Sequence, residues 1–64
     1  MCEANAYLLD DTGSEVLIMD SVDKVIPEAD GITLENIYSE RKTLRARIKR
    51  MELVEHRIIL ETID

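Results

Sequence analysis

The sequence predicts a small all-β domain, and three observations support this fold class. The β-branched residues Val, Ile and Thr account for 16 of the 64 residues, which suits the pleated, half-buried surface of a sheet. Short apolar segments alternate with turn-forming residues at 10–14 and 30–31. The second of these turns is Asp-Gly between apolar segments, a typical hairpin signal. We therefore expect one domain, residues 1–64, folded as a small β-barrel.

In the first half of the chain, three segments are predicted to be strands. Residues 2–8 alternate in polarity, so that one face carries Cys2, Ala4, Ala6 and Leu8. Residues 16–19 are an uninterrupted apolar run, which fits a strand that is buried on both faces. Residues 22–26 form a weaker strand, which Pro27 is expected to end.

The second half of the chain predicts three further strands. Ile32 and Leu34 alternate with polar residues, and Ile37 falls out of phase, which indicates a bulge or bend. Residues 43–49 alternate strictly, and residues 58–60 form the last strand. In the stretch 43–49 we expect Leu44, Ala46 and Ile48 to point inward, and Thr43, Arg45, Arg47 and Lys49 to point outward.

A helix is the alternative interpretation of residues 34–51. The apolar residues of this stretch fall at heptad spacing, at Leu34, Ile37, Leu44, Ile48 and Met51, with Arg41 in the gap. Such spacing also fits an amphipathic helix, and Glu, Arg and Lys are good helix formers. The turn-bounded strands on both sides favour the β interpretation.

The short chain has little material for a hydrophobic core. Below roughly 70–80 residues, a single core seldom supplies more than ~3–5 kcal/mol. The sequence has one cysteine, which allows no internal disulfide, and it has no Trp or Phe. We therefore expect a homodimer in which the second subunit completes the core.

The charge distribution disfavours nucleic acid as a partner. The chain has 14 acidic and 8 basic residues and a net charge of −6, whereas binding to phosphates depends on basic side chains. Six of the basic residues lie in 41–50, however, which contains no acid. An RNA-binding or protein-interaction module that uses the basic strand, with Arg45, Arg47 and Lys49 on one face, is the alternative function. Single-stranded RNA sites usually also contain aromatic stacking residues, and only two tyrosines are present.

The expected location is the cytoplasm. The first residues lack the basic and apolar regions of a signal peptide, and no apolar run approaches the ~18 residues of a membrane span. A single free thiol fits a reducing compartment. Catalysis finds no support, because the sequence has no Gly-rich phosphate loop and no Cys–His arrangement with an orienting partner. We therefore predict no catalytic residues.

The strongest candidate site is the N-terminus. The Met1 amine, the Cys2 amide nitrogen and the Cys2 thiolate can close two fused five-membered rings around one metal ion. Thiolate and planar nitrogen donors suit Cu(II) or Ni(II), and the need for deprotonation predicts that affinity falls at low pH. Without Met1, the amine and thiolate of Cys2 from two subunits could form an N2S2 plane. In the simplest alternative, Cys2 is a small buried apolar residue.

Two other side chains are candidate ligands, and one other function uses the same thiol. Glu3 could add a carboxylate, although on a regular strand its side chain points away from Cys2. His56 is the sole histidine and lies far along the chain, so a structural role is expected unless the fold places it beside Cys2. Two Cys2 residues at a dimer axis could also form a disulfide and act as a redox sensor.

The chain resembles the CooT family of small nickel-binding proteins. The resemblance is carried by residues 1–8, 22–28, 34–37, 46–49 and 53–61, and it therefore spans essentially the whole sequence. It implies a small Sm-like or SH3-like β-barrel that acts as a homodimer. It also implies that the metal residue of the family corresponds to Cys2, and it shifts the expected metal to Ni(II).

The resemblance further implies a function and a client. Founding members of the family accompany carbon monoxide dehydrogenase and are thought to help supply nickel to it. Some relatives were once described as predicted RNA-binding proteins. We therefore expect a non-enzymatic, metallochaperone-like protein with a nickel-requiring client enzyme.

Overall fold

Six β-strands and no helix form the described part of the chain, residues 3–63 of the computed structural model. The strands are β1 (Ala4–Leu9), β2 (Glu15–Glu28), β3 (Gly31–Asn36), β4 (Arg41–Leu44), β5 (Ala46–Glu52) and β6 (Arg57–Thr62). The predicted all-β class is confirmed. The helical alternative for residues 34–51 is wrong, because this stretch contains the end of β3, all of β4 and most of β5.

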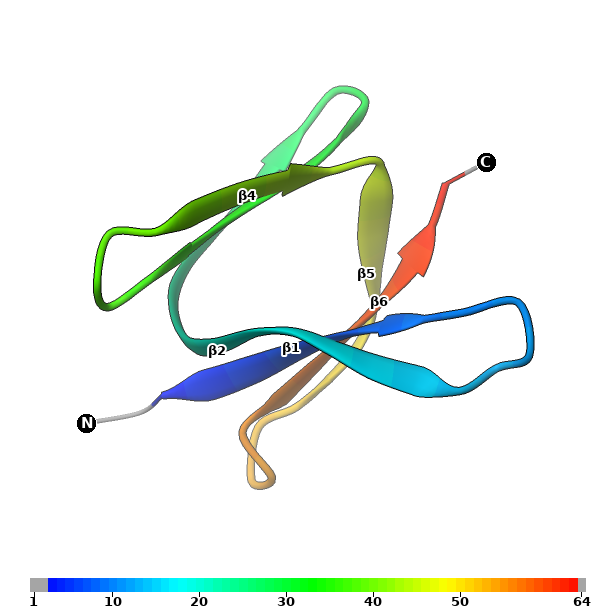
Figure 1. The fold of residues 1–64 in the computed structure, drawn as a ribbon, viewed down its shortest axis with the longest axis horizontal. Coiled ribbons are helices and arrows are strands. Elements are labelled where there is room, and N and C mark those ends of the chain that lie inside the picture. Colours follow the sequence, from blue (N-terminus) through cyan, green and yellow to red (C-terminus); the bar gives the residue numbers. More distant parts are fainter. Residues whose placement is uncertain (1–2, 64) are drawn as a thin grey trace.

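The strands form one sheet in the order β4-β3-β2-β1-β6-β5. All neighbouring pairs are antiparallel except β1 and β6, which run parallel. The sheet is strongly coiled, so that β4 and β5, its two edge strands, follow each other directly in the chain at Arg45 (Figure 1). The Ile63 amide donates a hydrogen bond to the Arg45 carbonyl at 3.0 Å. The two edge strands do not pair with each other, so the sheet is not closed, and the predicted small β-barrel is not confirmed.

The long strand β2 joins two segments that were predicted to be separate. Its first half pairs with β1 and its second half with β3, and Ser21 between them has a left-handed backbone, with a φ of 53°. Pro27 does not end the strand, but pairs with Ile32. The second half of β2 has a paired neighbour on one side only, and proline is tolerated at such edge positions because it cannot donate to a ladder.

The strand predicted around Ile32 and Leu34 and the strand predicted at 43–49 both form, but their ends differ from the prediction. Ile37 follows the end of β3 in the turn to β4, so its phase marks the end of a strand rather than a bulge within it. The stretch 43–49 is not one strand, because the chain bends at Arg45 between β4 and β5. Its alternation is nevertheless confirmed, since Leu44 and Ala46 are half-buried and buried and their neighbours are exposed.

The core is formed by buried side chains of β1, β2, β3, β5 and β6. Its largest fully buried side chains are Ile32, Leu34, Ile59 and Leu60. The prediction that residues 16–19 are buried on both faces is wrong for the first half of this run, because Val16 is 49% exposed and Leu17 is 52% exposed, whereas Ile18 is half-buried and Met19 is buried. Val16 and Leu17 lie in the first half of β2, which pairs with β1 in a hairpin but does not pair with β3. The run that is buried throughout is residues 58–60 in β6, between β1 and β5.

Candidate functional site

The sequence-predicted metal site begins just before the first strand. Met1 and Cys2 lie outside the described residues. Glu3, the third predicted ligand, is exposed and directly precedes β1. The surroundings of the predicted site are therefore defined by the residues that border the start of β1.

The start of β1 is held between β2 and the turn that precedes β6. Ala4 is paired with Val22 of β2, and Asn5 is paired with Arg57 of β6. The Asn5 amide also donates a hydrogen bond of 2.8 Å to the carbonyl oxygen of His56. This contact continues the parallel β1–β6 ladder by one residue. The chain therefore reaches β1 beside the β5–β6 turn (Figure 1).

His56, which was expected to have a structural role, lies in this turn. It has a left-handed backbone with a φ of 58°, a conformation in which histidine is several-fold enriched among residues other than glycine. Its amide donates to the Leu53 carbonyl at 3.3 Å, and its carbonyl accepts from Asn5. The backbone of His56 is thus structural, as expected. The fold also brings the sole histidine to the residues that follow Cys2, which the sequence did not indicate.

A pocket of about 270 Å³ opens between the start of β1 and the β5–β6 hairpin. It is lined by Ala4, Met51, Leu53, His56, Arg57 and Ile58. Its wall is mostly apolar, with polar side chains only from His56 and Arg57. The sequence analysis missed these lining residues, although Leu53 and Val54 stand out as two apolar residues in a turn between strands. Leu53 is 74% exposed and Val54 is 89% exposed.

Arg57 connects the β5–β6 hairpin to β1 and β2 through side-chain contacts. Its guanidinium donates a hydrogen bond of 2.9 Å to Glu52 and forms an ion pair with Glu15. It also lies over the ring of Tyr7, 4.9 Å from the ring centroid. A cation over an aromatic face contributes about 0.5–1 kcal/mol at an exposed site. The position of His56 beside β1 is therefore supported by neighbouring side chains as well as by the backbone.

The described residues do not form a complete metal site among themselves. In residues 3–63, no group of three or more His, Cys, Asp or Glu side chains is arranged to hold a metal ion. The prediction of Cys2, Met1 and Glu3 as ligands thus stays a prediction, and the structure adds the location of His56 to it.

The basic residues of the stretch 41–50 are distributed over both edge strands, and Arg41, Arg47 and Arg50 pair with carboxylates. Arg41 donates to Glu35 at 2.7 Å, and Arg47 donates to Glu61 at 2.9 Å. Arg50 pairs with Glu52 at 2.7 Å. Of the predicted basic face, Arg47 thus has an acidic partner on the neighbouring strand β6, whereas Arg41 and Arg50, which also pair with carboxylates, lie elsewhere in the stretch. Such pairing lowers the net charge that the edge strands offer to phosphates.

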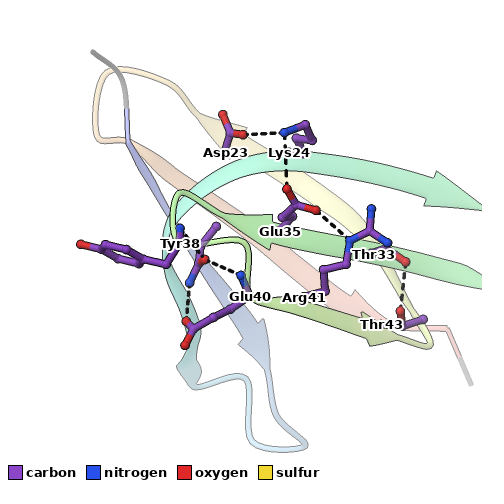
Figure 2. Close-up of polar contacts among 9 residues, drawn as sticks. Asp23, Lys24, Thr33, Glu35, Tyr38, Glu40, Arg41 and Thr43 are labelled. Carbon is purple, nitrogen blue, oxygen red and sulfur yellow. Dashed lines mark hydrogen bonds and ion pairs between the residues drawn. The ribbon is translucent and has the colours of Figure 1, made fainter.

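Glu35 illustrates how these ion pairs act on both partners (Figure 2). The hydrogen bond from Arg41, with a weaker one from Lys24 at 3.4 Å, holds the pKa of the Glu35 carboxyl below its usual value of 4.5. The Asp23 carboxylate, 2.8 Å from the Lys24 ammonium, raises the pKa of that lysine above 10.5. Both shifts favour the charged forms, as expected for solvent-accessible ion pairs.

A buried asparagine, Asn36, organises the turn between β3 and β4, directly after Glu35. Asn36 is 3% exposed, and its side-chain oxygen accepts hydrogen bonds of 2.9 Å from the amides of Tyr38 and Glu40. Its side-chain amide donates to the Glu40 carboxylate at 2.6 Å. Figure 2 shows the Tyr38 side chain pointing away from this turn, and Tyr38 is 70% exposed. The pattern of an asparagine that bonds the backbone two residues on is typical of Asx turns.

Neither a helix nor a membrane-spanning segment of helical type occurs in residues 3–63. This observation agrees with the absence of a long apolar run in the sequence.

Comparisons with known proteins agree on one family. The family model described as CO dehydrogenase accessory protein CooT matches residues 1–61. A crystal structure of a protein from Carboxydothermus hydrogenoformans, provisionally named CooT, is 49% identical and superposes with a TM-score of 0.88. That match covers 98% of this chain and 100% of the other. No curated protein matches the chain significantly. The chain therefore belongs to the CooT family of CO dehydrogenase accessory proteins.

Proposed function

We propose that this protein binds Ni(II) through Cys2 and delivers it to carbon monoxide dehydrogenase, without being an enzyme itself. The observation that carries the proposal is the family match over residues 1–61, which includes Cys2 and whose description names CO dehydrogenase. The chemistry of the N-terminus supports it, because an amine, an amide nitrogen and a thiolate suit planar Ni(II). Nickel is thus the cargo of this protein.

The position of the proposed ligands supports capture and release. Glu3 is exposed, and the first fully buried residue of β1 is Ala6, with the half-buried Ala4 packed against the core before it. Ligands that precede this point can be rearranged by a partner without opening the buried rows of the sheet. Exposure of the donor atoms to a receiving protein is what a transfer of metal requires, because ligand exchange proceeds through a shared complex.

Glu3 has a weaker claim as a ligand than Cys2. Carboxylates suit hard cations, whereas thiolate and nitrogen donors suit Ni(II) and Cu(II). Its exposure places it in solvent just before β1. We therefore assign Glu3 a role in attracting the cation rather than in holding it.

The proposal includes a homodimer in the cytoplasm. The family resemblance supports the dimer, and so do the small core and the two edge strands β4 and β5, which have unpaired backbone groups available to a second copy. A single thiol fits a reducing compartment. The molar mass in solution, measured by light scattering, tests the dimer directly, because a monomer has a mass of 7.4 kDa.

The central test is a titration of the reduced protein with Ni(II), followed by the charge-transfer absorption of a thiolate–metal bond. The wild-type protein is expected to develop this band, and Cys2→Ser is expected to lose it and to bind Ni(II) at least about tenfold more weakly. Glu3→Gln is the matched control, because it changes a neighbouring residue and removes a carboxylate but leaves the thiol. Equal binding by the wild type and Cys2→Ser would exclude Cys2 as the ligand.

Delivery to the client needs a separate measurement. Nickel-free carbon monoxide dehydrogenase is incubated with the Ni(II)-loaded protein in the presence of a competing chelator. The proposal predicts more active enzyme than with the same amount of free Ni(II) and chelator. Equal activation in both samples would leave a nickel-binding protein with no role in delivery to this enzyme.

A further inference from the structure

The free edge of β5 has backbone groups that no strand of residues 3–63 pairs with. β5 is the last strand of the sheet and is bonded only to β6. The Ile63 amide donates to the Arg45 carbonyl, and bonded pairs alternate along an antiparallel ladder. The backbone of Arg47 therefore points toward β6, and the N–H and C=O groups of Ile48 point to the open edge. We propose that this edge binds an extended segment of another protein in which acidic and apolar residues alternate.

The side chains of β5 set this alternating pattern. Ile48 is paired with Leu60 and Met51 with Ile58, and both partners belong to the core cluster, so Ile48 and Met51 lie on the core side of the sheet. The other residues between positions 47 and 50 are all basic: Arg47, Lys49 and Arg50. Side chains of adjacent strands interact when they lie opposite each other on one face. An added strand therefore matches β5 with apolar side chains on one face and carboxylates on the other.

An apolar pocket borders each part of this edge. A pocket of about 370 Å³ lies between the start of β5 and the β2–β3 hairpin, where Ile48, Pro27 and Ile32 line it. Met51 lines the pocket of about 270 Å³ beside the start of β1. Ile48 and Met51 are three residues apart, which is about 10 Å along a strand. A segment of about five residues can therefore place apolar side chains in both pockets while its backbone pairs with β5, as in strand addition to other sheet edges.

The basic side chains of β5 have room for an acidic partner. Lys49 is exposed and forms no hydrogen bond or ion pair with the rest of residues 3–63. Arg47 and Arg50 each pair with a carboxylate, but their side chains are still 68% and 48% exposed. A guanidinium has five N–H donors, so each arginine can accept a second carboxylate. The charge of the edge thus favours an acidic segment.

A second copy and a nucleic acid fit this edge less well. Two copies of β5 would bring together three basic residues from each chain, and like charges on adjacent strands are destabilising. The bulge at Lys49 also hinders pairing with an identical strand. β4 has two basic residues and is the more suitable edge for the proposed dimer. Phosphates would match the charge of β5, but not the two apolar pockets or the unpaired backbone of Ile48.

A peptide titration tests the proposal directly. Protein labelled with ¹⁵N is titrated with a short, end-blocked peptide of alternating glutamate and valine, and the backbone amides are followed by NMR. We expect shifts in residues 47–52, slower solvent exchange of the Ile48 amide and no change in β4. The same peptide with methylated backbone nitrogens cannot donate to the Ile48 carbonyl, and should bind at least about tenfold more weakly. Equal binding of the two peptides, shifts confined to other strands, or no binding at millimolar concentration would overturn the proposal.

Charge reversals on the two edge strands provide the second arm. Lys49→Glu should raise the Kd for the peptide about three- to tenfold, which is the size expected for loss and reversal of a cross-strand charge pair. Lys42→Glu, the same change on β4, is the matched control and should bind as the wild type does. Equal melting temperatures show that both variants are folded, and an unchanged Kd in Lys49→Glu would contradict the proposal. A peptide of alternating lysine and valine tests the charge on the wild-type protein, and tight binding of it would also contradict the proposal.

Two further samples identify the other occupants. If the Ile48 amide becomes protected as the protein is concentrated without peptide, a second copy covers the edge and the proposal is wrong. If a short uridine oligonucleotide displaces the peptide and shifts the same amides at physiological salt, the edge binds nucleic acid and the proposal is wrong. Cys2→Ser should bind the peptide as the wild type does, so the β5 edge and the proposed nickel site are tested independently.

Discussion

The buried centre of β6 and the turn that precedes it have opposite characters, although only a few residues separate them. Ile59 and Leu60 have no exposed surface, whereas Leu53 is 74% exposed and Val54 is 89% exposed. The centre of β6 pairs with β1 and contributes Ile58 and Leu60 to the core. The turn adds little to the core, but it lies beside the start of β1, which follows the proposed ligands in the sequence. Residues that stabilise the fold and residues that serve the proposed binding are therefore separable by mutation.

The largest effect is expected from removal of a core side chain. Leu34 has no exposed surface, and Leu34→Ala should destabilise the protein by about 2–5 kcal/mol through lost burial and a cavity. This loss is comparable with the ~3–5 kcal/mol that a single core of this size supplies. The free energy of unfolding, measured by urea denaturation, should fall close to zero.

Leu53→Ala is the matched control for this comparison, because it removes the same atoms from an exposed position. Its effect should lie within about 0.5 kcal/mol, as is usual for surface substitutions. Similar losses in the two variants would show that the turn also belongs to the core, and would remove the distinction between the two regions.

The second largest effect is expected at Gly31, where β3 passes close to the end of β4. A Cβ atom on Gly31 would lie 2.1 Å from the carbonyl oxygen of Leu44, so the backbone of one strand must move. Forced repacking of this kind costs about 1–3 kcal/mol. Gly31→Ala should therefore lower the melting temperature clearly. Gly13→Ala, at a φ of 85° with nothing within 4 Å of the new Cβ, measures backbone strain without the clash.

The behaviour of Gly31 also shows what the sequence could predict. Asp30-Gly31 correctly indicated a hairpin, but the two turn residues are 29 and 30, and Gly31 already pairs with Glu28. The reason for glycine is the contact with Leu44, which comes from another strand and leaves no local signal. The alternation in 43–49 and the apolar run at 58–60 could be predicted from the sequence, because the two faces of a strand set the polarity pattern of its own residues. The division of 43–49 between β4 and β5 could not.

Features that depend on which strands become neighbours in the sheet could not be predicted from the sequence. Val16 and Leu17 have the composition of a buried strand, yet they are exposed because only β1 pairs with that end of β2. Pro27 is tolerated within β2 for a related reason, since β1 does not extend along the second half. The chelating donors at Cys2 are visible in the sequence, and their role as nickel ligands stays a prediction. The approach of His56 to the start of β1 could not be predicted, because it depends on the non-local parallel pairing of β1 with β6.

An intermediate effect is expected from Asn36, which organises the β3–β4 turn. Asn36→Ala removes three hydrogen bonds from a residue that is 3% exposed, and leaves the amides of Tyr38 and Glu40 without this acceptor. Loss of a buried partner costs about 1–3 kcal/mol. Asn36→Asp keeps the acceptor oxygen and should retain part of this stability. The Kd for Ni(II) should not change in folded Asn36→Ala, and a change would couple this turn to the proposed site.

The smallest effect on stability is expected from the exposed ion pair between Glu35 and Arg41, and it depends on pH. Arg41 holds the pKa of Glu35 below its unfolded value of 4.5, so the pair stabilises the folded state above that pH. This contribution is lost as the pH falls through the lowered pKa. Glu35→Gln should therefore be slightly less stable than the wild type at neutral pH, and the two melting temperatures should converge in acid.

Metal release should occur at a higher pH than this loss of stability. A free thiol has a pKa of about 8.5, and its ligation requires the thiolate, so protons compete with Ni(II) well above the range in which Glu35 titrates. Acidification of the loaded protein should abolish the charge-transfer band first, with far-UV circular dichroism unchanged, and reduce the melting temperature afterwards. Glu35→Gln should shift only the second transition. Simultaneous loss of the band and of the folded state would mean that the proposed ligands depend on the same contacts as the core.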